Sequence, residues 1–505
     1  MNKFKTGILS LAVMLGLNTP TFGDTQEIQQ KAPIKKPNVI ILFLDDAGYA
    51  DVKAFGGKYE TKNLDKMAAE GQKWTNFYVS SPISSPSRAG LLTGRLGVRN
   101  GMYGTKVGVL MHKNTNGLPK SEVTIAEMLR DNGYQTSLLG KWHLGHFPEH
   151  YPTRHGFNYT YGPLYSNDMD WAPEYEKVMG GMVDAYTKKD WDRFNEIIAF
   201  RDNAIVHPKE EMWQNRVLTS QPKGDGTYDD SFTIMNQTTF TKDLTAQAKN
   251  YIDKNQDTPF FMYMAYTQTH VPLFVSPEFS GKTDSLYGDV MQEIDWSVGE
   301  IVDHLKKRGL DQDTLIIFTS DNGPWDVPAF VKAGHAGDTG GLAGGKNRTL
   351  EGGSRVPAIF YWPGTIKPQV IDGIGSTLDI LPTVANLSHS QLPTATLDGI
   401  DISSTLLEGK PSPREIYPYY MEGRFEAFRA GDWKLYLMRY ENRGSGAKPV
   451  ANAGYELYNL VDDKFELNNL VDQHPEIVAD ILAQAQKYNE SIGEYAPPLF
   501  DFNAQ

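Results

Sequence analysis

Two pairs of oxygen-bearing side chains follow apolar stretches of this sequence. Asp45 and Asp46 come directly after N-V-I-I-L-F-L, and Asp321 and Asn322 come directly after T-L-I-I-F-T-S. Three carboxylates and an amide oxygen that meet at one point would form an all-oxygen cage, which suits Ca²⁺ or Mg²⁺. Without a cation, that many buried acids would repel one another at considerable cost. The two pairs together therefore predict a site for a divalent metal ion.

Four basic residues stand where they could bind an anion beside that metal. Lys141 and His143 lie two apart in G-K-W-H, and an extended backbone would point both to the same side. His270 stands at the end of a predicted strand, in T-H-V-P, and Lys346 follows the glycine-rich run G-G-L-A-G-G. Any one of them alone would be a solvated lysine or a structural histidine. Together they indicate a site for a phosphoryl or sulfuryl ester.

A serine-rich stretch, S-S-P-I-S-S-P-S-R-A-G-L at residues 80–91, is either a polar loop before a helix or the place of a nucleophile. Pro86 suits the first turn of a helix, and Ser85 is the predicted N-cap. The helix N-terminus would offer free N–H groups to an anion. A nucleophile at Ser84 would stand at that end, with Arg88 in the helix behind it.

The apolar stretches before these residues are typical of buried parallel strands, and helical patterns alternate with them. We therefore predict an α/β fold, with a large, mostly parallel (mixed) sheet sandwiched by helices, over residues 37–387. Sites in such sheets form at the carboxyl ends of the strands. Residues 388–505 change to short alternating segments and one amphipathic helix, from Pro475 to about Ile492. They predict a small antiparallel sheet that carries a helix.

The N-terminus predicts export. Lys3 and Lys5 precede an apolar run at residues 8–17, so residues 1–23 are typical of a signal peptide and residues 24–36 of a leader. That run is too short to span a bilayer, although an uncleaved anchor helix is the alternative. The chain of 505 residues has no cysteine and a formal net charge of −13, which argues against nucleic-acid binding. We expect a periplasmic or secreted protein without a membrane span.

Several stretches resemble the type I sulfatases, which belong to the alkaline phosphatase superfamily. S-S-P-S-R-A-G-L-L-T-G-R resembles the first family signature, a cysteine or serine followed by x-P-S-R and T-G-R. G-Y-Q-T-S-L-L-G-K-W-H resembles the second, and blocks such as F-T-S-D-N-G and E-G-G-S-R-V-P follow in family order. The resemblance spans about residues 37–470. It implies an alkaline-phosphatase-like fold and the hydrolysis of sulfate esters.

The resemblance also implies that Ser84 is converted to formylglycine, whose hydrated form is the nucleophile. A plain serine would stay trapped as its ester, whereas the second hydroxyl of the hydrate allows sulfate to leave. A Ca²⁺ ion would be held by residue 84 together with Asp45, Asp46, Asp321 and Asn322. The other implied roles are positioning the nucleophile, for Arg88 and His143, and binding the sulfate, for Lys141, His270 and Lys346. Either His270 or Lys346 would protonate the leaving oxygen.

Most members of the family carry cysteine at the position of Ser84. Serine-type sulfatases exist in bacteria, so a native serine that is matured by a dedicated formylglycine-generating enzyme fits this chain. A cysteine exchanged for serine in the laboratory would look the same and would leave the protein inactive. Two other functions stay open: a phosphonate or phosphodiester hydrolase of the same superfamily, and an inactive homologue that binds sulfated glycans.

An insertion at about residues 172–214 matches none of the family blocks. Its aromatic and basic residues suggest either part of the substrate cleft or a helical surface segment. Trp191 and Arg193 are the candidate substrate-binding residues. Exported sulfatases of this kind act mostly on sulfated carbohydrates, so a carrageenan-type galactan or a glycosaminoglycan is the expected substrate.

Overall fold

The computed structural model describes residues 36–103, 108–437, 439–441, 449–450 and 454–493. The predicted signal peptide and almost all of the predicted leader lie outside these residues. The described residues form a ten-stranded sheet, a four-stranded sheet and a two-stranded ribbon. The strands of the large sheet are β1 (Asn38–Leu44), β2 (Gln72–Tyr78), β3 (Gln135–Gly140), β4 (Tyr159–Pro163), β5 (Arg216–Pro222), β6 (Tyr228–Ile234), β7 (Phe260–Ala265), β8 (Thr314–Ser320), β9 (Arg355–Tyr361) and β10 (Gln369–Ser376).

The large sheet has the order β10-β2-β9-β8-β1-β7-β3-β4-β5-β6. Its centre, from β8 to β4, is parallel, and β9, β5 and β6 introduce the antiparallel pairs. Parallel strands are buried on both faces, and every residue of β1 is buried. The structure thus confirms the predicted α/β class and the mixed, mostly parallel sheet.

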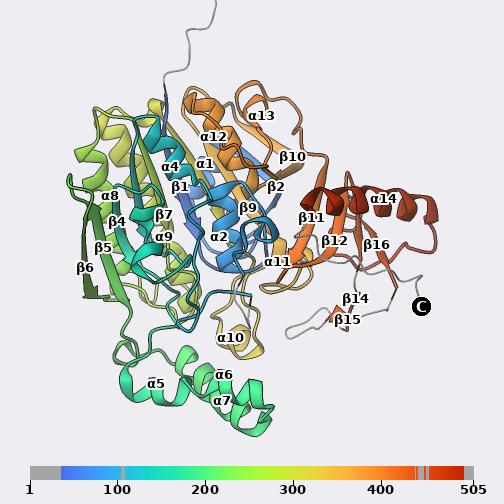
Figure 1. Ribbon diagram of the computed structural model, residues 1–505, viewed down its shortest axis with the longest axis horizontal. Coiled ribbons are helices and arrows are strands. Elements are labelled where there is room, and N and C mark those ends of the chain that lie inside the picture. The colour runs from blue at the N-terminus through green and yellow to red at the C-terminus, as the bar shows by residue number, and fades with distance from the viewer. Residues whose placement is uncertain (1–35, 104–107, 438, 442–448, 451–453, 494–505) are drawn as a thin grey trace, which may run out of the picture. The chain divides into compact units, whose positions relative to one another are not determined.

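Helices cover both faces of the large sheet (Figure 1). On one face, α1, α8 and α9 pack together, and their apolar side chains join Ile40, Leu42 and Leu44 of β1 in one core. Helices α2, α4 and α12 pack together as a second group. The bounds of these helices are α1 (Lys62–Glu70), α2 (Ser84–Thr93), α4 (Ile125–Asp131), α8 (Phe240–Lys254), α9 (Leu286–Arg308) and α12 (Ile380–Ser388).

The predicted insertion is helical, and its helices lie together below the sheet, apart from those that cover it (Figure 1). They are α5 (Pro173–Met179), α6 (Met182–Lys188) and α7 (Trp191–Val206). The remaining short helices are α3 (Gly97–Asn100), α10 (Pro328–Ala333), α11 (Glu351–Ser354) and α13 (Ser403–Glu408). Among the described residues, no helix is both long and apolar enough to cross a membrane.

The C-terminal part forms the predicted antiparallel sheet with one helix, α14 (Pro475–Ile492), against it. The sheet has the order β11-β12-β13-β16, and a separate ribbon pairs β14 with β15. The bounds are β11 (Ile416–Met421), β12 (Arg424–Ala430), β13 (Trp433–Tyr436), β14 (Arg439–Tyr440), β15 (Pro449–Val450) and β16 (Glu456–Asn459). The domain boundary at residues 387/388 stays a prediction.

Three local expectations were wrong. Strand β3 ends at Gly140, whose φ of 108° turns the chain, and His143 has a φ of 60°, so this segment is not extended. Strand β7 ends at Ala265, which leaves His270 in the following loop. Helix α2 starts at Ser84 with Ile83 as its N-cap. The hydroxyl of Ser85 does not cap the helix, because it accepts a hydrogen bond from Leu110 N at 3.1 Å.

Candidate active site

The predicted metal ligands meet at the carboxyl edge of the sheet. Strands β1 and β8 are parallel neighbours, with Leu44 opposite Ser320, so the residues that follow each strand emerge side by side. Carboxylate oxygens of Asp45, Asp46 and Asp321 lie within 4.8 Å of one another, and all three residues are buried. The sheet therefore brings together acids that are far apart in the chain.

A left-handed turn aims the second acid into this cluster. Asp46 has a φ of 63°, and its N–H donates to Asp321 Oδ1 at 3.1 Å. Asn322 Nδ2 donates to Asp46 Oδ1 at 2.7 Å. Asn322 Oδ1 is buried, and the described part of the chain offers it no hydrogen-bond partner. This oxygen and the carboxylates form a hard, all-oxygen donor set, which fits Ca²⁺ or Mg²⁺.

Ser84 lies at the cluster, as the first residue of α2. Its Oγ is 2.7 Å from Asp321 Oδ2, 3.3 Å from Asp45 Oδ1 and 3.2 Å from Lys141 Nζ. Ser84 is only 1% exposed. Among the serines of residues 80–91, Ser84 is the one with described contacts to the acids. Its place at the first turn matches the prediction that singled it out.

Arg88, one turn further along α2, contacts the same two acids as Ser84. Its Nη2 lies 2.8 Å from Asp321 Oδ2 and 3.3 Å from Asp45 Oδ1, and its guanidinium carbon is 5.4 Å from the centre of the Phe43 ring. Burial alone would lower the pKa of Arg88, but the two acids raise it above its usual value. The residue is therefore a fixed positive charge.

Two lysines each hold one of the acids. Lys141 Nζ lies 2.6 Å from Asp45 Oδ2, and Lys346 Nζ lies 2.8 Å from Asp46 Oδ2. Burial lowers the pKa of Lys141, although Asp45 opposes the shift. Burial also acts to lower the pKa of Lys346, but Asp46 and Asp45 raise it above its usual value. Burial likewise would raise the pKa of Asp45, yet Lys141 and Arg88 hold it well below its usual range.

The formal charges of this cluster cancel. The three acids Asp45, Asp46 and Asp321 face three bases, Arg88, Lys141 and Lys346. Buried charges are tolerated when each is paired. The three bases therefore offset part of the repulsion among the acids that the sequence led us to expect.

His270 lies against Lys346, and its Nε2 is 3.6 Å from Asp46 Oδ2. Its Nε2 is 2.9 Å from Lys346 Nζ, and its Nδ1 is 2.6 Å from Val271 O. Because a carbonyl oxygen can only accept, Nδ1 carries a proton, and Nε2 of the neutral ring accepts from Lys346. Lys346 and His270 thus form a hydrogen-bonded pair at the edge of the cluster.

His143 is near the cluster but is held differently from the other bases. Its Nε2 lies 3.0 Å from Leu110 O, while its buried Nδ1 has no hydrogen-bond partner among the described residues. Burial, with Lys141 and Arg88 nearby, keeps the pKa of His143 well below its usual value. The ring is therefore neutral, with one nitrogen left to bind another group.

Two residues beside His270 were missed by the sequence analysis. The Trp325 ring centre lies 4.6 Å from Lys346 Nζ and 5.6 Å from the His270 ring centre. Asp168 Oδ1 lies 3.9 Å from His270 Nδ1. Trp325 follows closely on the Asp321–Asn322 pair in D-N-G-P-W, which is the signal that could have pointed to it.

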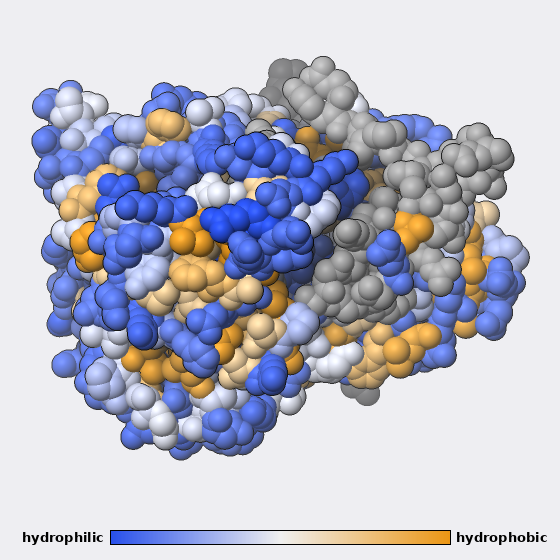
Figure 2. Space-filling model, turned by 90° about the horizontal axis from the view of Figure 1, so that it is seen from below, coloured by the Kyte–Doolittle hydropathy of each residue, from blue (hydrophilic) through white to orange (hydrophobic). Residues whose placement is uncertain are grey.

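The structure does not bring Trp191 and Arg193 to this cluster through any described contact. Trp191 starts α7, is 50% exposed and packs edge-on against Phe194, and Arg193 pairs with Glu196 at 3.2 Å. The same helix reaches the site with another residue: the Arg201 guanidinium carbon lies 5.3 Å from the Trp325 ring centre. Seen from the side where α5–α7 lie, the surface is mostly hydrophilic with small hydrophobic groups (Figure 2).

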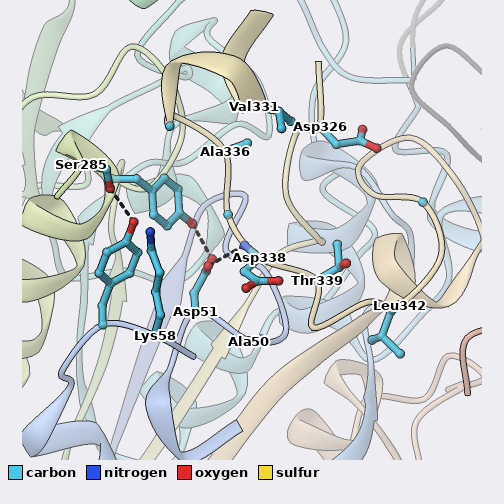
Figure 3. Close-up of a pocket in the computed structure, with 15 residues that line it drawn as sticks. Ala50, Asp51, Lys58, Ser285, Asp326, Val331, Ala336, Asp338, Thr339 and Leu342 are labelled. Carbon is cyan, nitrogen blue, oxygen red and sulfur yellow. Dashed lines mark hydrogen bonds between the residues drawn. The ribbon is translucent and has the colours of Figure 1, made fainter. Parts of the chain in front are cut away.

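A separate cavity of about 550 Å³ has Asp51, Lys58, Ser285 and Asp338 in its wall (Figure 3). Asp51 on its wall accepts hydrogen bonds from the N–H groups of Gly48 and Asp338, and the Tyr287 hydroxyl lies 2.5 Å from its Oδ2. Burial raises the pKa of Asp51 to about 7. None of the predicted site residues lines this cavity.

Comparisons with known proteins agree with this geometry. The Sulfatase family model matches residues 37–390. Arylsulfatase A of Bos taurus is 36% identical over 479 residues, which cover 91% of this chain and 88% of that protein.

Solved structures give the same result. The PsFucS1 sulfatase from Pseudoalteromonas sp. superposes with a TM-score of 0.75 at 27% identity, and the match covers 92% of this chain and 91% of that one. Ps i-CgsB, solved in complex with k-i-k-neocarrahexaose, has a TM-score of 0.69 at 25% identity, with 92% and 95% covered. The chain therefore belongs to the sulfatase family and is a sulfuric ester hydrolase.

Proposed function

We propose that this sulfatase hydrolyses a sulfate ester of a carbohydrate, with Ser84 converted to formylglycine as its nucleophile and Ca²⁺ as its metal. The observation that carries the proposal is the setting of Ser84 Oγ, between the carboxylates of Asp321 and Asp45 and the ammonium of Lys141. A serine that merely capped a helix would not need two acids and a lysine around its hydroxyl.

The residues of the chain divide the work as follows. The metal ligands would be Asp45, Asp46, Asp321 and Asn322, with residue 84. When bound, the ion would neutralise charge at the sulfate group. The aldehyde hydrate would supply two hydroxyls on one carbon, one of which is the nucleophile. Lys141 and Lys346 bind the sulfate oxygens, because both ammonium groups are buried at the cluster and point donors toward it. Arg88 holds Asp321 and Asp45 through the same carboxylate oxygens that Ser84 contacts.

The Lys346–His270 pair is the proposed acid for the leaving oxygen. Lys346 Nζ and His270 Nε2 are 2.9 Å apart, so one hydrogen bond joins the two groups. Val271 O accepts from Nδ1 and keeps Nε2 facing Lys346. His143 is the proposed acceptor for a proton from residue 84, because its ring is neutral and its Nδ1 has no hydrogen-bond partner among the described residues.

A carbohydrate substrate is supported by relatives of this chain. The structure of Ps i-CgsB holds k-i-k-neocarrahexaose, and N-acetylgalactosamine-6-sulfatase of Mus musculus is 34% identical over 417 residues. A carrageenan-type galactan or a glycosaminoglycan, met in the periplasm or outside the cell, is therefore the proposed substrate. Trp191 and Arg193 are the proposed contacts for its more distant sugars.

Mass spectrometry of the peptide that contains residue 84 tests the nucleophile. Conversion of serine to the aldehyde removes two hydrogens, so protein co-produced with a serine-type maturation enzyme should lose about two daltons at Ser84. Released sulfate should rise with the modified fraction. Ser80→Ala is the matched control. It should leave the mass of the residue-84 peptide and the released sulfate unchanged, since the hydrogen bonds of Ser80 Oγ within the described part of the chain go to the backbone oxygens of Pro86 and Ser87. Multiple turnovers by wholly unmodified protein would refute the proposal.

A further inference from the structure

The short helix α11 (Glu351–Ser354) touches the segment that carries Asp321 and Asn322. Gly323, the next residue, donates its N–H to Gly353 O at 3.0 Å. A Cβ on Gly323 would lie 1.8 Å from Gly352 O, so the two backbones are in direct contact. A shift of α11 would therefore also move the backbone that carries the predicted metal ligands Asp321 and Asn322.

The same helix also contacts the segment that leads to the nucleophile. Val79 N donates to Ser354 O at 3.0 Å. The loop just before α11 adds a second contact, since Asn347 N, next to Lys346, donates to Pro82 O at 2.8 Å. Ser84 follows this segment after one further residue. The loop at residues 346–350 and α11 thus hold the nucleophile segment from one side.

A carboxylate inside α11 ties this region to the C-terminal sheet. Glu351 is fully buried, and it accepts hydrogen bonds from Tyr78 at 2.7 Å, from Tyr419 at 2.9 Å and from Lys434 Nζ at 2.9 Å. Tyr78 is the last residue of β2, directly before the nucleophile segment. Burial would raise the pKa of Glu351, but Lys434 and Arg355 hold it below its usual range.

Lys434, on β13, holds the loop as well as the carboxylate. Its Nζ donates to Thr349 O at 2.9 Å and lies 3.1 Å from Glu466 Oε1. Its side chain is fully buried, with the Tyr419 ring centre 4.0 Å away. A buried lysine with this many partners is fixed in position, and it fixes Thr349, three residues after Lys346.

We propose that Lys434 is a positioning residue for the sulfatase reaction. Its bonds to Glu351 and Thr349 set the backbone that carries Lys346. Through Glu351 and Tyr78, the same contacts set the backbone that leads to Ser84. The C-terminal sheet thus contributes to the active site through the backbone that Lys434 holds. This inference rests on the proposed roles of Ser84 and Lys346.

The test uses the full-length, matured enzyme and an aryl sulfate, para-nitrophenyl sulfate. Lys434→Met keeps the length of the side chain and removes its donors. We expect kcat per modified molecule to fall roughly a hundred-fold, because misplaced catalytic groups slow an enzyme by about that factor. Lys434→Arg should restore much of the loss, because arginine keeps the charge and the donors. The modified fraction is measured by mass spectrometry and the folded fraction by circular dichroism.

Arg414→Met is the matched control. Arg414 is a buried cation bound to Asp379, with Nε 2.9 Å from Asp379 Oδ2, and its other partners are backbone oxygens outside residues 346–354. The Arg414→Met variant should have a lower thermal stability than the wild type and an unchanged kcat per folded, modified molecule. If Lys434→Met does not fold, the double variant with Glu351→Gln removes both charges and should show the same loss of kcat.

An unchanged kcat in folded Lys434→Met, or in the folded double variant with Glu351→Gln, would overturn the inference, as would an equal loss in the Arg414 control. A wild-type enzyme that releases no sulfate would count against the proposed function instead. The two failures are therefore distinguishable.

Discussion

Gly140→Ala should disable the site without touching any group in it. Gly140 ends β3, directly before Lys141, and its φ is 108°. A Cβ at this position would lie 1.8 Å from Ala265 O of the neighbouring strand. An ordinary contact needs about 3.4 Å, so the strand end must move by roughly 1.5 Å, which is the scale of misplacement that costs about a hundred-fold in rate.

The energetic cost follows from the same geometry. An alanine at this φ costs about 1–3 kcal/mol in backbone strain, and the overpacked contact costs about as much again. The hydrogen bond from Lys141 N to Ala265 O, at 2.8 Å, is lost when the strands separate and adds about 1 kcal/mol. We expect a loss of about 3–7 kcal/mol in the free energy of unfolding.

Gly133→Ala at the other end of the same strand is the control. Gly133 has a φ of 88°, but a Cβ there would meet nothing within 4 Å. It should cost only about 1–2 kcal/mol of backbone strain and leave kcat per modified molecule near that of the wild type. Denaturant unfolding and sulfate release measure the two effects. A Gly140→Ala enzyme as stable and as active as the Gly133→Ala control would refute the reasoning.

Three further outcomes are expected. Asp321→Ala should abolish calcium binding, measured by calorimetry, together with activity, and full activity after exhaustive chelation would contradict the metal assignment. Burial lowers the pKa of His155 from 6.5 to about 4, so the unfolded chain takes up its proton first as the pH falls. The free energy of unfolding should therefore drop by about 3 kcal/mol between these pH values, and His155→Phe should remove that part of the drop. Replacing Trp191 and Arg193 with alanine should slow turnover of a large sulfated glycan but not of an aryl sulfate, and an equal loss on both would mean that the segment supports the fold.

Much of the site could be predicted because several of its residues come directly after predicted strands. Asp45 and Asp321 come straight after runs of apolar, β-branched residues, and parallel neighbours bring such positions to one edge. Local patterns also sufficed for the sheet class and for α14, whose start at Pro475 and end near Ile492 were predicted correctly.

The rest depends on contacts that no local pattern encodes. His270 and His143 lie in turns after their strands, where periodicity gives no direction for a side chain. Trp325 matters only because Lys346 and His270 fold against it. The bond between Lys434 and Glu351 joins positions 83 residues apart, and only the packed C-terminal sheet makes it visible.

The cancelling charges of the cluster have a consequence for how ligands would bind. Lys141 and Lys346 each occupy a carboxylate that a metal ion would also use, and both are proposed to bind sulfate. Each ammonium has three N–H donors, but its single charge is shared between a carboxylate and a sulfate when both are bound. A cation that took over the carboxylates would release the lysines for the anion, and a bound anion would in turn vacate the carboxylates. By thermodynamic linkage, each ligand would then raise the affinity for the other by the same factor, so that metal and substrate act as cooperative partners.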